Sequence, residues 1–145
     1  MNNKNNQKGC LDISQLQPGA ILACKLTFYY HTGVYIGNGK AAELQSCGTI
    51  REVDLSAFRR TADAIYVACK KQCEVLFDQV IADRAIEKID KCWGYHLLKN
   101  NCHQFTSGCL DGDLCTRENL LYKLEPQICA HYQLNECICW AKICC

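Results

Sequence analysis

Hydrophobic and polar positions form short blocks through the first half of the chain, a pattern typical of β-strands. A turn signal at 16–19 precedes the first apolar block. A second turn signal, Gly37-Asn38-Gly39, is typical of a hairpin because Asn and Gly accept the positive φ angles of tight turns. The pattern predicts five strands, at 20–24, 32–36, 40–44, 49–53 and 64–68.

The hydrophobic period changes after residue 75. From 75 to 92 apolar residues recur at helical spacing, with charged residues on the other side. A second helix is expected to begin near Asn101 and to stop at Asp111-Gly112-Asp113. The segment 116–145 is less regular, and we expect another helix within it. Strands followed by helices indicate an α+β fold.

Length and charge narrow the class of protein. The 145 residues suffice for one domain, and 16 basic residues nearly balance 15 acidic ones, for a net charge of +1. The chain therefore lacks the excess of positive charge that is typical of proteins that bind nucleic acid. The polar start of the chain lacks the apolar core of a signal peptide, and no apolar run could span a membrane. We therefore expect a cytoplasmic protein, of undetermined oligomeric state.

Cysteine is the outlying residue type, with 14 copies. In a secreted chain this density would indicate a disulfide framework. In the absence of an export signal we expect reduced thiols, most of them buried as small apolar residues. No Cys-x-x-Cys pair, no His pair at ligand spacing and no phosphate-binding glycine loop occurs, so we expect neither a metal site nor a cofactor.

Cys102 has the local context of a reactive thiol. It follows two asparagines and opens a predicted helix, so Asn101 is placed as the N-cap and Cys102 in the first turn. There the helix dipole and free N–H groups favour a thiolate and could stabilise an oxyanion. The alternative is a buried structural cysteine at a helix start.

A thiolate nucleophile requires a general base and a group that orients the base. Of four histidines, His31 begins a predicted strand, and Glu43 follows twelve residues later across the hairpin turn. A hairpin brings the two positions opposite one another, within hydrogen-bond reach. The alternative is a histidine at a strand edge and a solvated glutamate.

Three segments resemble the lecithin:retinol acyltransferase-like family: Pro18-Gly19-Ala20-Ile21-Leu22, the stretch from His31 to Gly39, and the box Asn101-Cys102-x-x-Phe105. That family includes the phospholipase/acyltransferases called HRAS-like suppressors and belongs to the circularly permuted NlpC/P60 papain-like group. The resemblance extends from Leu16 to Leu110. It implies a permuted papain-like fold, in which a small antiparallel sheet packs on helices that include the one carrying the nucleophile.

The resemblance implies catalytic roles for Cys102 as nucleophile and His31 as general base. The family's third polar residue, usually a second histidine, aligns with Glu43. A carboxylate can orient His31, so a Cys-His-Glu triad is expected. The chain also has His103-Gln104 where the commoner box has Glu-His. Both departures bear on substrate specificity.

We therefore expect a cysteine-nucleophile acyltransferase or hydrolase that forms a thioester acyl-enzyme. The resemblance suggests acyl-lipid substrates with ester or amide bonds. The string 95–105, together with His31-Thr32, also resembles the PPPDE group of permuted papain-like isopeptidases, so an amidase or isopeptidase acting on peptide-type bonds is an alternative. A non-catalytic lipidated binding module is the third interpretation.

The predicted organisation has three parts: a disordered polar tail at 1–12, the catalytic domain at 13–127 and a Cys-rich apolar segment at 128–145. Lipidation of cysteines in the last part would give peripheral membrane contact. The favoured alternative is a packed terminal helix with buried thiols. The five cysteines concerned are Cys129, Cys137, Cys139, Cys144 and Cys145.

Overall fold

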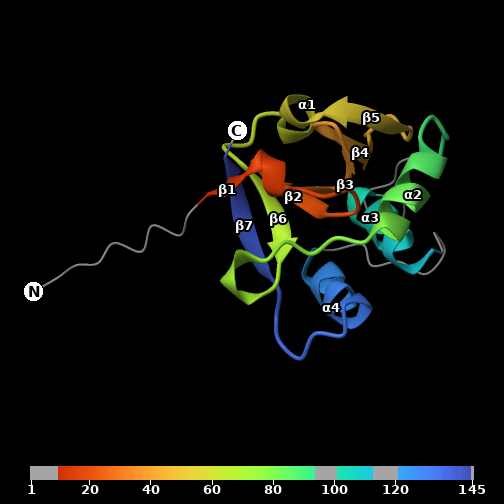
Figure 1. Ribbon diagram of the computed structural model, residues 1–145. Helices are drawn as coiled ribbons and strands as arrows, with labels where there is room; N and C mark the ends of the chain where they lie inside the picture. The colour runs from red at the N-terminus through yellow and green to blue at the C-terminus, as the bar shows by residue number, and fades with distance from the viewer. Residues whose placement is uncertain (1–9, 94–100, 113–120, 145) are drawn as a thin grey trace, which may run out of the picture.

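The computed structural model describes residues 10–93, 101–112 and 121–144. These residues build one seven-stranded sheet with the strand order β1-β7-β6-β2-β3-β4-β5 (Figure 1). Neighbouring strands are antiparallel except β1 and β7, which are parallel. The strands are β1 (Leu11–Asp12), β2 (Ile21–Lys25), β3 (Tyr30–Gly37), β4 (Lys40–Leu44), β5 (Ile50–Asp54), β6 (Ile65–Cys69) and β7 (Cys139–Cys144).

The five strands predicted from the sequence correspond to β2 to β6. The hairpin turn between β3 and β4 is confirmed as well, since Gly37, Asn38 and Gly39 all have positive φ, at 96°, 52° and 70°. Together with the helices, this sheet confirms the α+β class, and the arrangement is consistent with the permuted papain-like fold.

The described residues contain four α-helices and two short 3₁₀ turns. The segment predicted as a helix from residue 75 becomes helical only at 79, because Leu76 still bonds β6 through Ala68 O and the Asp78 side chain caps the helix at Val80 N. The elements are η1 (Ile13–Gln15), α1 (Leu55–Arg59), η2 (Lys71–Cys73), α2 (Gln79–Lys88), α3 (Cys102–Asp111) and α4 (Leu121–His131).

The C-terminal segment corrects the sequence-based prediction. The favoured prediction from the sequence is a packed terminal helix over 128–145, but α4 ends at His131 and β7 then enters the sheet beside β6. Its burial alternates: Ala141 and Ile143 are buried, whereas Lys142 and Cys144 are exposed. The boundary placed between residues 127 and 128 therefore falls inside α4, and the segment is integral to the domain.

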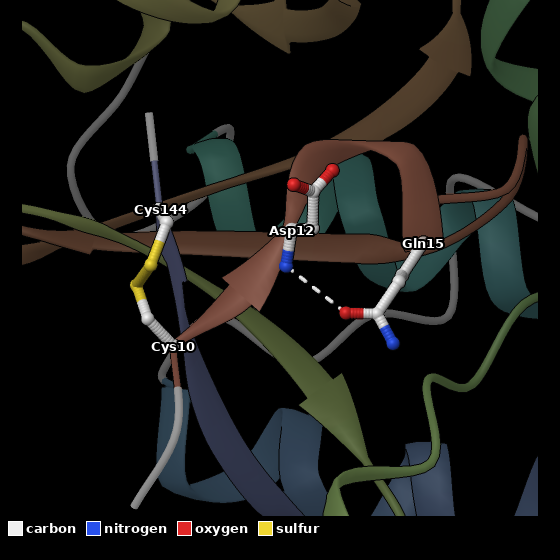
Figure 2. The surroundings of a disulfide bond; sticks show 4 residues. All are labelled: Cys10, Asp12, Gln15 and Cys144. Atoms are coloured by element: carbon white, nitrogen blue, oxygen red, sulfur yellow. Dashed lines mark hydrogen bonds between the residues drawn. A yellow bond between two sulfur atoms is a disulfide. The ribbon is translucent and has the colours of Figure 1, made fainter. Parts of the chain in front are cut away.

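The other end of the chain requires a similar correction. Residues 11–12, assigned to the disordered tail, form β1 and pair in parallel with β7. Asp12 also caps η1, accepting a hydrogen bond from Ser14 N at 2.7 Å, while its own N–H donates to Gln15 Oε1 at 2.9 Å (Figure 2). Residues 1–9 of the predicted tail lie outside the described residues.

A disulfide joins Cys10 to Cys144, although the sequence predicted free thiols (Figure 2). The pairing of Leu11 with Ile143 brings the two cysteines together, and a sequence separation of 134 carries no local signal. Cys144 cannot be lipidated while this disulfide is formed, and Cys145 lies outside the described residues. The other ten cysteines of the described ranges have free thiols.

The central strands β2, β3 and β4 are buried on both faces. Helices α2, α3 and α4 cover one face through side chains such as Ile81, Phe105 and Leu124, and α1 covers part of the other through Phe58. Burial on both faces explains the almost continuous apolar character of β2. No helix in the described ranges is long and apolar enough to cross a membrane.

Candidate functional site

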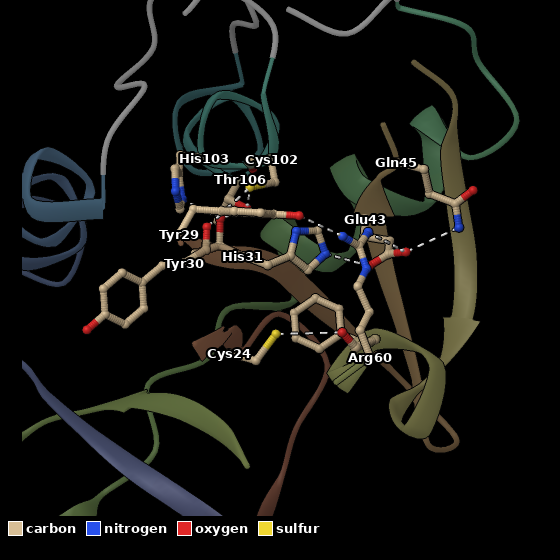
Figure 3. A network of polar contacts seen from close by, with 12 residues as sticks. Cys24, Tyr29, Tyr30, His31, Glu43, Gln45, Arg60, Cys102, His103 and Thr106 are labelled. Carbon is tan, nitrogen blue, oxygen red and sulfur yellow. Dashed lines mark hydrogen bonds and ion pairs between the residues drawn. The ribbon is translucent and has the colours of Figure 1, made fainter. Parts of the chain in front are cut away.

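The predicted base and its partner lie side by side on adjacent strands. His31 begins β3, Glu43 lies in β4, and Nε2 of His31 is 2.5 Å from Oε2 of Glu43 (Figure 3). Each side chain is only 2% exposed. Val34 pairs with Ala42, so Glu43 lies diagonal to His31 on the same face rather than directly opposite it.

Cys102 is the first residue of α3, as the sequence predicted. Asn101 caps the helix: its side chain accepts a hydrogen bond from Gln104 N at 3.1 Å, and Gln104 Oε1 accepts one from Asn101 N at 3.0 Å. This is a complete capping box. Gln104, where the commoner family box has histidine, thus serves the helix start and fixes the position of Cys102.

The structure brings Cys102 to the same point as His31. Cys102 Sγ lies 3.9 Å from the backbone oxygen of Tyr30, the residue that precedes His31, and the Cys102 and His31 side chains interact closely enough to shift one another's pKa. Because Glu43 occupies Nε2 of His31, Nδ1 is the nitrogen left for the thiol. All three residues predicted for the site therefore converge, and Cys102 is 3% exposed.

The electrostatics of the three groups are coupled. Burial alone would raise the pKa of Cys102 and lower that of His31. Their hydrogen bond and mutual attraction outweigh burial, so the pKa of Cys102 is lowered and that of His31 is raised. Glu43 behaves likewise: burial opposes its charge, but His31 and Arg60 lower its pKa overall. These directions favour a thiolate beside an imidazolium.

Two residues that sequence analysis missed hold the Glu43 carboxylate. Arg60 Nη2 lies 3.5 Å from Glu43 Oε1, and Gln45 Nε2 donates to the same oxygen at 3.2 Å (Figure 3). Gln45 follows Glu43 at the period of a strand and could have been found from that spacing. Arg60 offered no signal, because it lies just after α1, with a φ of 54°.

A second missed group ties α3 to β3. Thr106 Oγ1 lies 3.0 Å from Cys102 O and 3.1 Å from Thr32 Oγ1, and Thr32 Oγ1 is 3.0 Å from Nδ1 of His103. Burial, with repulsion from His31, lowers the pKa of His103 to about 4, so its ring is neutral at pH 7. This chain of polar contacts fixes the helix that carries Cys102 against the strand that carries His31.

A mostly apolar groove of about 270 Å³ opens beside the site. Tyr30, whose carbonyl contacts Cys102, contributes to its wall. Two other lining residues are bonded to each other: Trp140 Nε1 donates to Glu125 Oε1 at 2.8 Å. The complete lining is Ala23, Cys24, Lys25, Tyr30, Tyr66, Glu125 and Trp140.

The described residues contain no cluster of side chains that could bind a metal ion. In the ranges 10–93, 101–112 and 121–144, no three His, Cys, Asp or Glu side chains are grouped to hold an ion. His96, and residues 95–100 of the string that resembles the PPPDE group, lie outside these ranges.

Comparison with known proteins supports the resemblance noted in the sequence. The sequence model of the family described as lecithin retinol acyltransferase matches residues 14–115. The match spans more than half of the 145-residue chain and includes all three converging side chains. No curated protein matches the chain. On the strength of the family match, this chain is a member of the lecithin retinol acyltransferase family.

Proposed function

We propose that the protein is a thiol acyltransferase or hydrolase that works through a thioester on Cys102. The family in general points to acyl-transfer or hydrolytic chemistry. The observation that carries the finer proposal is the contact of Cys102 with His31, whose other ring nitrogen is held by Glu43. A nucleophile, a base and an orienting carboxylate in this order are the parts that covalent acyl transfer requires.

The first half-reaction makes the acyl-enzyme. His31 takes the proton of Cys102, and the thiolate attacks the carbonyl carbon of the donor. The oxyanion is stabilised at the start of α3, where the helix dipole and the Cys102 N–H are directed toward it. When the intermediate collapses, the proton on His31 passes to the leaving alcohol or amine, and the acyl group remains on Cys102 as a thioester.

The second half-reaction releases the acyl group. His31 takes a proton from water or from an acceptor hydroxyl or amine, whose oxygen or nitrogen attacks the thioester carbon. The Cys102–carbonyl bond breaks and the thiolate is restored with its proton returned through His31. Glu43 holds the imidazole in one orientation and stabilises its positive charge throughout both steps.

The groove beside Tyr30 favours an acyl lipid as the donor. Its aromatic and aliphatic lining suits an acyl chain, and its polar groups are few. The volume of about 270 Å³ accommodates part of a chain rather than a whole phospholipid. We propose a cytoplasmic location, where the ten free thiols of the described ranges stay reduced and the Cys10–Cys144 disulfide opens to two thiols.

Intact-mass spectrometry after incubation with a phospholipid tests the proposal. We expect a mass increase of one acyl group that is lost on hydroxylamine treatment and absent in Cys102→Ala. Cys24→Ala is the matched control: Cys24 pairs with His31 across β2 and β3, but burial raises its pKa to about 11, so it remains a thiol. An adduct that survives in Cys102→Ala would contradict the proposal. Labelling of Cys102 by a ubiquitin-type electrophile without acylation by lipid would instead indicate an isopeptidase.

A further inference from the structure

The turn between β2 and β3 exposes three consecutive aromatic side chains. Phe28 is 94% exposed, more than any other large apolar residue in the described ranges, and Tyr29 and Tyr30 are 46% and 44% exposed. We call residues 26–30 the aromatic tip. The Tyr30 ring points away from Cys102, whereas Tyr29 extends toward Arg60 (Figure 3). Aromatic rings gathered on a projecting turn indicate a surface that contacts something other than water.

The base of the aromatic tip carries positive charge. A hollow of about 300 Å³ lies against it, and Arg60 is the cation in its wall, with Nη1 3.5 Å from the Tyr29 hydroxyl while Nη2 pairs with Glu43. Lys25, at the end of β2, is exposed and pairs with Tyr30. Apolar and aromatic groups at the end of a turn, with cations behind them, match the layering of a bilayer with anionic headgroups. The hollow is lined by Leu26, Thr27, Phe28, Tyr29, Arg60 and Thr61.

The aromatic tip is also the part of the chain that borders the site. Tyr30 supplies the backbone oxygen next to Cys102 and one wall of the apolar groove, and His31 follows it directly. A lipid surface against the tip would therefore lie beside both the thiol and the groove. An acyl chain could enter the groove while its headgroup stayed near the cations.

We propose that the aromatic tip docks on membranes that contain anionic lipids and presents their ester bonds to Cys102. The occupant is a lipid surface, not the cysteine-rich C-terminal segment and not a second protein. This inference deepens the proposed function, because it makes a lipid held in a membrane the substrate. The binding step requires no acyl transfer, so it can be tested without the chemistry.

Vesicle co-sedimentation of the Cys102→Ala protein tests the docking alone. We expect it to sediment with phosphatidylcholine vesicles that contain phosphatidylserine, and less with pure phosphatidylcholine or in high salt. Phe28→Ser should reduce the partition coefficient at least tenfold, and Lys25→Gln should remove part of the dependence on phosphatidylserine. Phe77→Ser is the matched control, because Phe77 is 51% exposed but lies just before α2, outside the tip. Equal thermal stability of the Phe28 and Phe77 variants shows that the fold is intact.

Two results would overturn the docking proposal. One is equal binding by Cys102→Ala and Cys102→Ala/Phe28→Ser, or no binding by either. The other is self-association, seen by sedimentation velocity, that Phe28→Ser abolishes while vesicle binding is absent.

The two proposals can fail independently: vesicle binding with no acylation of Cys102 would refute only the thioester mechanism. Acylation by a short-chain soluble ester that Phe28→Ser leaves unchanged, with no vesicle binding, would refute only the docking.

Discussion

Glu43 and His31 form a buried pair across adjacent strands, with Oε2 2.5 Å from Nε2 and both side chains 2% exposed. A buried ion pair is stable only where further hydrogen bonds or charges satisfy the remaining carboxylate oxygen. Arg60 and Gln45 supply those partners at the other oxygen. The orientation of His31 is therefore set by three side chains, which come from β4 and from the segments that follow β4 and α1.

Replacing Glu43 with Gln should lower kcat without abolishing the fold. Gln keeps a hydrogen-bond acceptor near Nε2 but removes the charge that stabilises the imidazolium. A charge-assisted hydrogen bond is worth about 1.5–3 kcal/mol, so we expect roughly a 10- to 100-fold loss in acylation rate. Single-turnover acylation of Cys102 followed by mass spectrometry measures it.

Glu52→Gln is the control for that experiment. Glu52 is exposed on β5, the strand paired with β4, so its loss removes a carboxylate from the same sheet without touching His31. We expect an unchanged rate. Equal rates in the Glu43 and Glu52 variants would show that Glu43 does not support His31.

The pH dependence of alkylation reports the coupled thiol. The lowered pKa of Cys102 means that its thiolate is populated at pH values where a free thiol, with a pKa of about 8.5, is protonated. The iodoacetamide rate of Cys102 should therefore rise with pH and level off below that range. His31→Asn removes the strongest of the interactions that lower the pKa of Cys102 against burial, so the midpoint should move upward. Peptide mapping with the exposed Cys137 as internal reference measures both; an unmoved midpoint would separate His31 from the thiol.

Turnover should have an alkaline limit as well. The pKa of His31 is raised, so the imidazolium persists above the usual imidazole range and is lost only as the pH exceeds that raised value. Acylation should thus increase as Cys102 loses its proton and decrease as His31 loses its own. A rate that keeps rising at alkaline pH would show that imidazolium is not needed to protonate the leaving group.

The sequence predicted much of this site because its signals are local. Strand periodicity and the turn at 37–39 place His31 and Glu43 on one hairpin, and the two asparagines before Cys102 mark a helix start. Arg60 could not be predicted, since its approach to Glu43 depends on how α1 ends. The same holds for His103, whose contact with Thr32 joins residues 71 positions apart.

At the C-terminal end of the chain, the fold likewise depends on long-range contacts that the sequence pattern does not reveal. Strand β7 is a short, mainly apolar run with the sequence Cys-Trp-Ala-Lys-Ile-Cys, a pattern that does not distinguish a strand from a buried helix. Its assignment depends on pairing with β6 and β1, which are distant in the sequence. The prediction of a terminal helix was therefore wrong, whereas strands bounded by glycine turns were placed to within two residues at each end.

His103 should make stability depend on pH in mildly acid solution. Its pKa is about 4 in the folded state and about 6.5 for a free imidazole. Between these two pH values His103 is therefore protonated in the unfolded chain and neutral in the folded one. Stability must then fall as pH drops from about 6.5 toward 4, by about 3 kcal/mol in total. Urea unfolding of His103→Asn should show a loss smaller by that amount, since Glu43 titrates in both proteins. Parallel curves for the two proteins would contradict this assignment.

Gly33 is needed next to His31 for reasons of space. A Cβ there would lie 2.7 Å from Ala42 O and 2.7 Å from a ring carbon of Phe58, which itself packs 5.0 Å from the His31 ring. We expect Gly33→Ala to lower the free energy of unfolding by about 1–3 kcal/mol and to slow the alkylation of Cys102. Urea unfolding checks the first effect, and a change below about 0.5 kcal/mol would show that the hairpin relaxes freely.

The Cys10–Cys144 disulfide should contribute to stability and not to chemistry. It closes a loop across a sequence separation of 134, and links of this kind are worth about 2–5 kcal/mol, chiefly through the unfolded chain. The strands it joins, β1 and β7, lie on the far side of β6 and β2 from the strand that carries His31. Cys10→Ser should therefore lower the free energy of unfolding by that amount under oxidising conditions, and leave the acylation rate of Cys102 within about twofold.

Cys47→Ser, which removes an exposed free thiol, is the control and should change neither quantity. Under reducing conditions wild type and Cys10→Ser should become equally stable; a difference that persists there would place the effect of Cys10 in packing rather than in the bond.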